Sequence, residues 1–200
     1  MDRVGIFGGT FNPLHKGHLG ILQGAKHLFS LDRVYVVPTG ESYHKNVGYL
    51  PKVEDRIELV RLALEVDPAF ILSTVDLERG GPTYTVETIR DIRKLEPTAE
   101  LFLILGSDAF LDILSWKGAL EIAGEVKFLV ALRKGDYALD IEAFKSEAPA
   151  PFENRVFLFQ WPIPDISSGG IKKRGLEKKH FPPGVYEYIK RKGLYPDDVR

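Results

Sequence analysis

The sequence predicts an α/β protein: a doubly wound parallel sheet with helices on both faces, followed by a small C-terminal helical subdomain over roughly residues 166–200. Two observations predict it. Short, continuously apolar runs alternate along the chain with longer segments whose apolar residues recur at helical spacing. Continuous apolar strands are typical of parallel sheets, because both faces of such a sheet are covered. We expect the 200 residues to form a single domain.

The strands of this sheet are predicted from six apolar runs, which are Val4–Phe7, Val34–Val37, Phe70–Thr74, Leu101–Leu105, Lys127–Leu132 and Asn154–Phe159. Three intervening segments have helical spacing, namely Lys16–Phe29, Glu54–Val66 and Thr85–Leu95. In the first of these helices the apolar residues recur at every third position and are expected on one face: Leu19, Leu22, Ala25 and Leu28. The Pro- and Ala-rich stretch Glu147–Phe152 is expected to be a loop.

Composition and charge argue against several classes of function. Lys and Arg number 27 against 28 Asp and Glu, and this near-neutral balance argues against a general nucleic-acid coat. The absence of cysteine removes disulfides, thiolate nucleophiles, zinc–thiolate sites and iron–sulfur clusters. The longest apolar runs are far shorter than the ~20 residues of a membrane helix, and the N-terminus lacks a signal-peptide core. We therefore expect a cytoplasmic protein that binds neither nucleic acid nor membrane.

One part of the chain departs from this balance. Lys172–Lys192 holds eight basic residues against two glutamates. The span is either a solvated helical face or a segment whose first part closes over polyanionic phosphates.

The segment richest in chemistry is GGTFNPLHKGH, Gly8–His18, which follows the first strand and opens the first helix. Gly8 and Gly9 allow close approach of a ligand, and the helix start offers N–H groups suited to phosphate. His15 and His18 are three residues apart and share one side of the helix start. Two imidazoles beside a phosphate can stabilise charge during phosphoryl transfer. A plain tight turn, a zinc site lacking its third ligand, and ordinary surface histidines are the alternatives.

This segment resembles the GG[TS]F[DN]PxHxGH signature of the nucleotidylyltransferases that carry an HxGH motif. The rest of the chain resembles one branch of them, the bacterial nicotinate-mononucleotide adenylyltransferases. The resemblance continues, in order, through Gly40–Lys45, Arg79–Thr88 (RGGPTYTVET), Leu105–Trp116 (LGSDAFLDILSW), Arg133–Gly135, Ile166–Lys172 (ISSGGIK) and Val185–Tyr195.

The resemblance implies a Rossmann-like fold and a reaction that joins ATP to nicotinate mononucleotide, with release of pyrophosphate and no covalent enzyme intermediate. It implies Mg²⁺ on the ATP phosphates, with Asp108 as a conceivable ligand; Asp108 could instead hold a sugar hydroxyl or cap a helix. His15 and His18 would be catalytic. The implied ATP-binding residues are Gly8, Gly9, Thr10, Phe11, His15, His18, Gly106, Asp108, Ser167, Ser168 and Lys172.

For the mononucleotide, the resemblance implies Lys45, Thr85, Trp116 and Arg133. The alternatives are an exposed lysine for Lys45, a helix N-cap for Thr85 and a core side chain for Trp116. The family's ISSTxIR pattern has Thr and Arg where this chain has Gly169 and Lys172, which weakens the expected phosphate clamp. A nucleotide-binding homologue with lost or altered catalysis is therefore one alternative, and a pantetheine-phosphate adenylyltransferase is another. Oligomeric state is not predicted.

Overall fold

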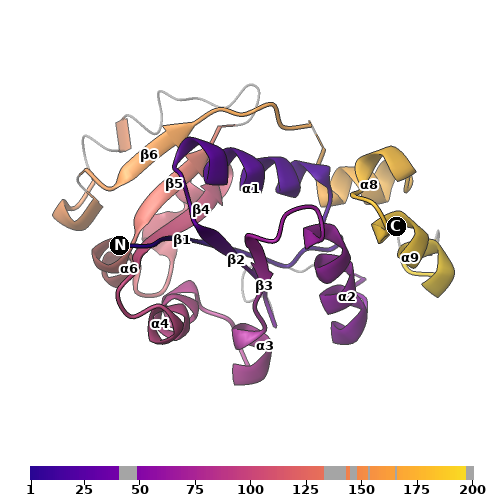
Figure 1. Cartoon of the computed structure of the whole chain (residues 1–200), viewed down its shortest axis with the longest axis horizontal. Helices are drawn as coiled ribbons and strands as arrows, with labels where there is room; N and C mark the ends of the chain where they lie inside the picture. Colours follow the sequence, from indigo (N-terminus) through magenta and orange to yellow (C-terminus); the bar gives the residue numbers. More distant parts are fainter. Residues whose placement is uncertain (41–48, 133–142, 145–147, 153, 165, 197–200) are drawn as a thin grey trace.

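The computed structural model describes residues 1–40, 49–132, 143–144, 148–152, 154–164 and 166–196 (Figure 1). Its centre is a six-stranded sheet in which every neighbouring pair is parallel. The strand order is β3 (Phe70–Leu72), β2 (Arg33–Pro38), β1 (Arg3–Gly9), β4 (Glu100–Gly106), β5 (Lys127–Ala131) and β6 (Val156–Phe159). The order reverses between β1 and β4, the point at which open α/β sheets bind ligands at the carboxyl ends of strands. The predicted doubly wound parallel sheet is confirmed.

Helices cover both faces of this sheet, as the sequence predicts (Figure 1). Alternate residues of β4 enter two separate cores: Phe102 and Ile104 join one, while Leu101, Leu103 and Leu105 join the other. The first core contains side chains of α1 (Lys16–Leu28), α2 (Val53–Leu64), α8 (Ser168–Arg174) and α9 (Val185–Lys192). The second contains side chains of α4 (Thr85–Leu95), α5 (Ser107–Leu111) and α6 (Ala119–Glu125).

The remaining elements are short. They are α3 (Val75–Arg79), which follows β3, and the 3₁₀ turns η1 (Ile113–Ser115), η2 (Ala150–Phe152) and η3 (Lys178–His180). The turn η2 lies inside the stretch predicted to be a loop. The sequence analysis did not predict α3 and α6, because helices of five to seven residues are too short to display a 3.6-residue period.

The prediction that Leu28 shares one face of α1 with Leu19, Leu22 and Ala25 is wrong. Leu19, Leu22 and Ala25 are buried, but Leu28 is 47% exposed. Each residue advances an α-helix by about 100°, so a three-residue spacing drifts around the axis. Nine residues separate Leu19 from Leu28, which places the two side chains on opposite sides of α1.

Two glycines of α1 leave room for the chain after β6 to pack closely against this helix. A Cβ at Gly24 would lie 2.7 Å from the Trp161 side chain, and one at Gly20 would lie 3.4 Å from Ile163. The chain after β6 therefore packs directly on α1. It delivers α8 beside the start of α1, where the Ser168 hydroxyl donates to the Pro13 carbonyl at 3.1 Å (Figure 1).

None of the helices in the described part of the chain combines the length and apolar character needed to cross a membrane.

Candidate active site

A cavity of about 240 Å³ opens at the carboxyl ends of the central strands. It brings together six residues predicted to bind the substrates, from four separate parts of the chain: Gly8, Gly9, Thr10, Thr85, Gly106 and Trp116. Side chains that the sequence analysis did not single out complete its wall, namely Thr39, Asp76, Thr83, Tyr84, Thr88 and Lys117.

The other predicted residues lie outside this cavity lining. Phe11, His15 and His18 adjoin it, since the ring centroid of His18 lies 5.4 Å from that of Phe11 and 6.2 Å from that of the cavity residue Phe7. Asp108 is exposed on α5 and does not line the cavity. Lys45 and Arg133 lie outside the described residues.

The two histidines form a stacked pair at the start of α1. Their ring centroids are 3.8 Å apart, with an interplanar angle of 27°. His15 is the N-cap of the helix and is buried; its Nδ1 accepts from the Gly17 N–H at 3.1 Å. The His15 N–H donates in turn to Nδ1 of His18 at 3.3 Å. Because each Nδ1 accepts a hydrogen bond, a neutral ring carries its proton on Nε2, which makes Nε2 of both rings a donor.

The segment that contains Gly169 and Gly170 forms helix α8. Ser167 caps α8 by accepting from the Gly170 N–H at 3.1 Å, and Ser168 contacts the first loop as described above. A side chain at Gly169 would meet no atom within 4 Å, so its absence does not serve packing. Lys172 is half-buried, and burial lowers the pKa of its ammonium group. Ser167, Ser168 and Lys172 thus share the one short helix that adjoins the first loop.

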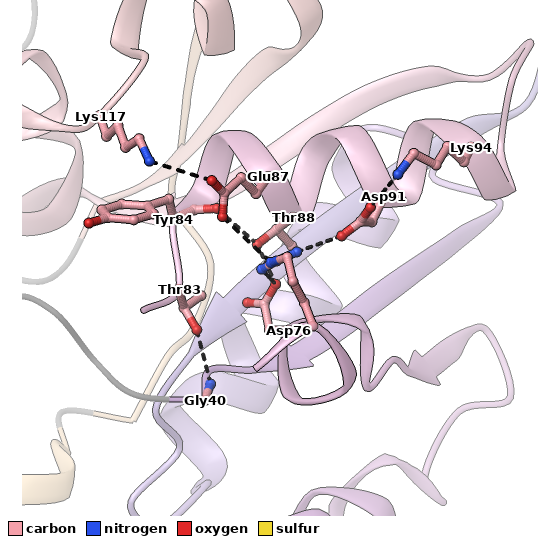
Figure 2. Close-up of polar contacts among 10 residues, drawn as sticks. Gly40, Asp76, Thr83, Tyr84, Glu87, Thr88, Asp91, Lys94 and Lys117 are labelled. Atoms are coloured by element: carbon pink, nitrogen blue, oxygen red, sulfur yellow. Dashed lines mark hydrogen bonds and ion pairs between the residues drawn. The ribbon is translucent and has the colours of Figure 1, made fainter. Parts of the chain in front are cut away.

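The opposite wall of the cavity is an ionic network between α3 and α4 (Figure 2). Asp76 is 2% exposed, and its Oδ1 accepts from the Thr88 hydroxyl at 2.7 Å and from Arg79 Nη2 at 2.6 Å. Arg79 also donates to Asp91 at 2.5 Å. Burial raises the pKa of Asp76, and the hydrogen bonds from Thr88 and Arg79 offset only part of that rise. The sequence signal for this network was the Asp–x–x–Arg spacing of Asp76 and Arg79, in which the arginine is the first residue of RGGPTYT.

The same wall carries aromatic side chains. The Lys117 ammonium lies 3.8 Å from the centroid of the Tyr84 ring and 3.5 Å from Glu87 (Figure 2). Trp116 is half-buried on the cavity. Beside them the Thr83 hydroxyl accepts from the Gly40 N–H at 3.1 Å. Aromatic and cationic groups therefore lie together on this wall.

The described residues contain no group of three or more His, Asp or Glu side chains placed to hold a metal ion.

The parallel sheet, the glycine-rich first loop and the histidine pair define a nucleotidyltransferase. A family model described as cytidylyltransferase-like matches residues 6–174. A protein of Corynebacterium kroppenstedtii named "Probable nicotinate-nucleotide adenylyltransferase" is 39% identical, over 96% of this chain and 90% of that protein. A Dictyoglomus turgidum protein of the same name is 36% identical, over 98% and 97% of the two chains. The chain belongs to the cytidylyltransferase-like family and, within it, to the nicotinate-nucleotide adenylyltransferases.

Solved structures share the fold. The Plasmodium falciparum nicotinic acid mononucleotide adenylyltransferase complexed with APC has a TM-score of 0.77 at 21% identity, covering 100% of this chain and 99% of that one. The same enzyme complexed with NaAD has a TM-score of 0.76 at 24% identity, with the same coverage.

Proposed function

We propose that this protein transfers the adenylyl group of ATP to nicotinate mononucleotide, forming nicotinate adenine dinucleotide and pyrophosphate. One observation carries the proposal: the first loop and the wall that contains Tyr84 and Trp116 line the same cavity. The histidine pair lies beside that cavity. Relatives that are 36–39% identical over nearly their whole length bear the name of this activity.

In the proposed reaction an oxygen of the mononucleotide 5′-phosphate attacks the α-phosphorus of ATP. The bond from that phosphorus to the bridging oxygen breaks, and pyrophosphate leaves with the electron pair. Negative charge grows on the leaving oxygen and on the equatorial oxygens of the α-phosphate. His18, with His15 stacked on it, would donate from Nε2 to these oxygens and lower the barrier. No nucleophilic side chain of the enzyme takes part.

The ATP side of the proposal rests on the first loop and its neighbours. Gly8, Gly9 and Thr10 would present backbone groups to the nucleotide, and the Phe11 ring would shape their outer edge. Ser167, Ser168 and Lys172 of the adjoining segment would contact the β- and γ-phosphates, and Gly106 would lie near the ribose. Asp108, which is exposed and outside the cavity lining, remains a prediction from the sequence for the ribose or the metal.

The mononucleotide side rests on the α4 wall. The N–H groups at the start of α4, beginning at Thr85, would bind the nicotinate carboxylate, because a helix N-terminus favours an anion. Trp116 would stack on the pyridine ring. Lys45 and Arg133 remain predictions from the sequence.

Mg²⁺ belongs to the proposal as a partner of ATP. The described residues, which hold no cluster of ligands, fit an ion carried mainly by phosphate oxygens, with Asp108 as the one protein carboxylate proposed to assist. Bound there, the ion would neutralise charge on the phosphates. The cytoplasmic location predicted from the sequence remains part of the proposal.

The test is pyrophosphate release by the purified protein with ATP and a panel of phosphate acceptors, with and without Mg²⁺. We expect turnover with nicotinate mononucleotide, less with nicotinamide mononucleotide and none with pantetheine phosphate. A neutral amide offers an NH₂ group that opposes the N–H donors of α4, whereas a carboxylate accepts from them. ATP binding without turnover of any acceptor would instead favour the homologue with lost catalysis, which Gly169 and Lys172 suggest.

A further inference from the structure

Arg56, in the first turn of α2, is an arginine that is buried without a counter-charge among the residues the structure describes. It is 2% exposed and ranks among the largest fully buried side chains. Among the described residues no carboxylate lies within ion-pair distance of it, and its Nε has no hydrogen-bond partner. Burial lowers the pKa of its guanidinium, yet an arginine remains protonated in proteins. Burying an unpaired charge is costly, so the charge calls for an explanation.

The guanidinium contacts two carbonyls at the ends of neighbouring strands. Nη1 donates to the Thr39 carbonyl at 2.8 Å and approaches the Thr10 carbonyl at 3.4 Å. Thr10 directly follows β1, Thr39 directly follows β2, and both residues line the cavity. Arg56 therefore lies behind the cavity wall that carries the first loop.

Because the peptide group is planar, the position of each contacted carbonyl also determines where the N–H of the same peptide points. The Thr10–Phe11 and Thr39–Gly40 bonds are trans, so the N–H of each peptide points away from the carbonyl that Arg56 holds. The Gly40 N–H shows this plainly, because it donates to the hydroxyl of the cavity residue Thr83 (Figure 2). The Phe11 N–H is directed in the same sense, away from Arg56, and makes no hydrogen bond among the described residues.

The backbone at this point is also strained. Phe11 has a φ of 45°, in the left-handed region that a bulky side chain rarely adopts. Such conformations persist where the surroundings hold them and are concentrated at functional sites. The Thr10 carbonyl, held by Arg56, belongs to the peptide that joins Thr10 to this strained residue.

We propose that Arg56 is a positioning residue for the anionic substrate: it aims the Phe11 N–H toward the phosphates and places behind the first loop a positive charge that no described carboxylate pairs, so that the substrate phosphates supply a counter-charge. The proposal rests on the proposed function and adds to it a residue that touches no substrate. It explains why α2, far from the first loop in sequence, has a buried cation in its first turn.

The test uses the full chain, two substitutions at Arg56 and one matched control. Arg56→Met removes the charge and keeps the apolar stem, whereas Arg56→Lys keeps a charge but replaces the planar guanidinium, whose Nη1 reaches both carbonyls, with an ammonium group on a stem of different shape. Arg61→Met is the control, since Arg61 lies on the exposed side of the same helix and pairs with Glu58 and Glu65. The readouts are kcat and KM for ATP, and the rise in Tm on titration with inorganic pyrophosphate.

We expect Arg56→Met to lower kcat/KM for ATP by about 10- to 100-fold and to abolish most of the pyrophosphate-induced rise in Tm. The kinetic loss should be smaller than the roughly 10²–10³ that removal of a donor in direct contact with the anion costs, because Arg56 acts through the first loop. Arg56→Lys should lose less of that rise while its kcat still falls. Arg61→Met should match the wild type in all three readouts.

Wild-type kinetics in either folded Arg56 variant would overturn the proposal, as would a lower Tm with unchanged kcat and KM. An equal loss of the pyrophosphate response in both variants would overturn the role of charge. If Arg56→Met does not fold, the kinetics of Arg56→Lys decide. Should the wild type make no dinucleotide from nicotinate mononucleotide while pyrophosphate still stabilises it through Arg56, the proposed function fails and the role of Arg56 stands.

Discussion

The two walls of the cavity are built differently. The first-loop wall presents backbone groups, held from behind by hydrogen bonds to carbonyls from Arg56 and Ser168. The α3–α4 wall presents mainly side chains, beside the first N–H groups of α4, and the Asp76–Arg79–Thr88 network holds it (Figure 2). Backbone N–H groups suit phosphates, which every nucleotide has, whereas side-chain walls suit the part that differs between nucleotides. Under the proposed function, the reacting phosphates would lie at the first-loop wall and the choice of acceptor would be made at the α3–α4 wall.

The largest effect should come from the first-loop wall. His18→Ala should lower kcat by about 10²–10³-fold, because it removes a donor aimed at charge that grows only in the transition state. Steady-state kinetics measure this, with a thermal melt to check folding. His27→Ala is the matched control, since His27 is an exposed residue in the last turn of the same helix. A folded His18→Ala protein with wild-type kcat would contradict the proposed mechanism.

At the opposite wall, Trp116→Ala should weaken mononucleotide binding by about 1–3 kcal/mol, the usual contribution of a base–aromatic stack, and ATP binding much less. Trp116→Phe should recover part of the loss. Calorimetric titration of each substrate separates the two affinities. Equal weakening of both, together with a lower Tm, would show that Trp116 serves mainly the core.

The side-chain wall also predicts a stability effect. Thr88→Val should lower the free energy of unfolding by about 1–3 kcal/mol, because the buried Asp76 carboxylate loses a donor. Urea denaturation measures it. Thr74→Val serves as the control, since the Thr74 hydroxyl bonds Glu78 in an exposed position. Comparable losses in the two variants would argue against a special role for the buried network.

The smallest expected effect is on the pH dependence of stability. It involves Asp76 and Asp91, the two carboxylates that accept hydrogen bonds from Arg79. Burial raises the pKa of Asp76, with Thr88 and Arg79 opposing; burial also acts on Asp91, but hydrogen bonds from Lys94 and Arg79 bring its pKa below the usual value. The native state thus holds a proton on Asp76 more tightly than the unfolded chain does. The stability this contributes is full below the unfolded pKa of about 3.9 and is lost as pH rises through the higher native pKa.

For Asp91 the sign is opposite: its contribution is present above the unfolded pKa and is lost as pH falls through the lower native pKa. Relative to wild type, Asp76→Asn should therefore gain stability as pH rises from about 4 toward neutrality, at about 1.4 kcal/mol per unit of pKa shift. Asp91→Asn should lose stability relative to wild type as pH rises toward about 3.9, in the acidic window between the lower native pKa and the unfolded one. Urea denaturation at several pH values measures both, and the same slope in the two variants would contradict the assignment.

Sequence periodicity anticipated most of the fold, because each long element carries its own pattern. Thr85–Leu95 was predicted to the residue, and the strands Lys127–Leu132 and Leu101–Leu105 to within one residue at each end. The prediction for Leu28 was wrong because a three-residue period drifts around a helix. The strand predicted to reach Thr74 ends at Leu72, since α3 starts three residues later.

By itself, the sequence determined the α/β class, the place of GGTFNPLHKGH between the first strand and first helix, and the pairing of His15 with His18. These depend on residues close together along the chain. Tertiary structure alone decided that Asp76 is buried with Thr88, 12 residues on, that Arg56 reaches Thr10 across 46 residues, and that Ser168 meets Pro13 across 155. Burial and counter-charge are properties of packed surroundings, and local sequence pattern does not encode which distant residues supply them.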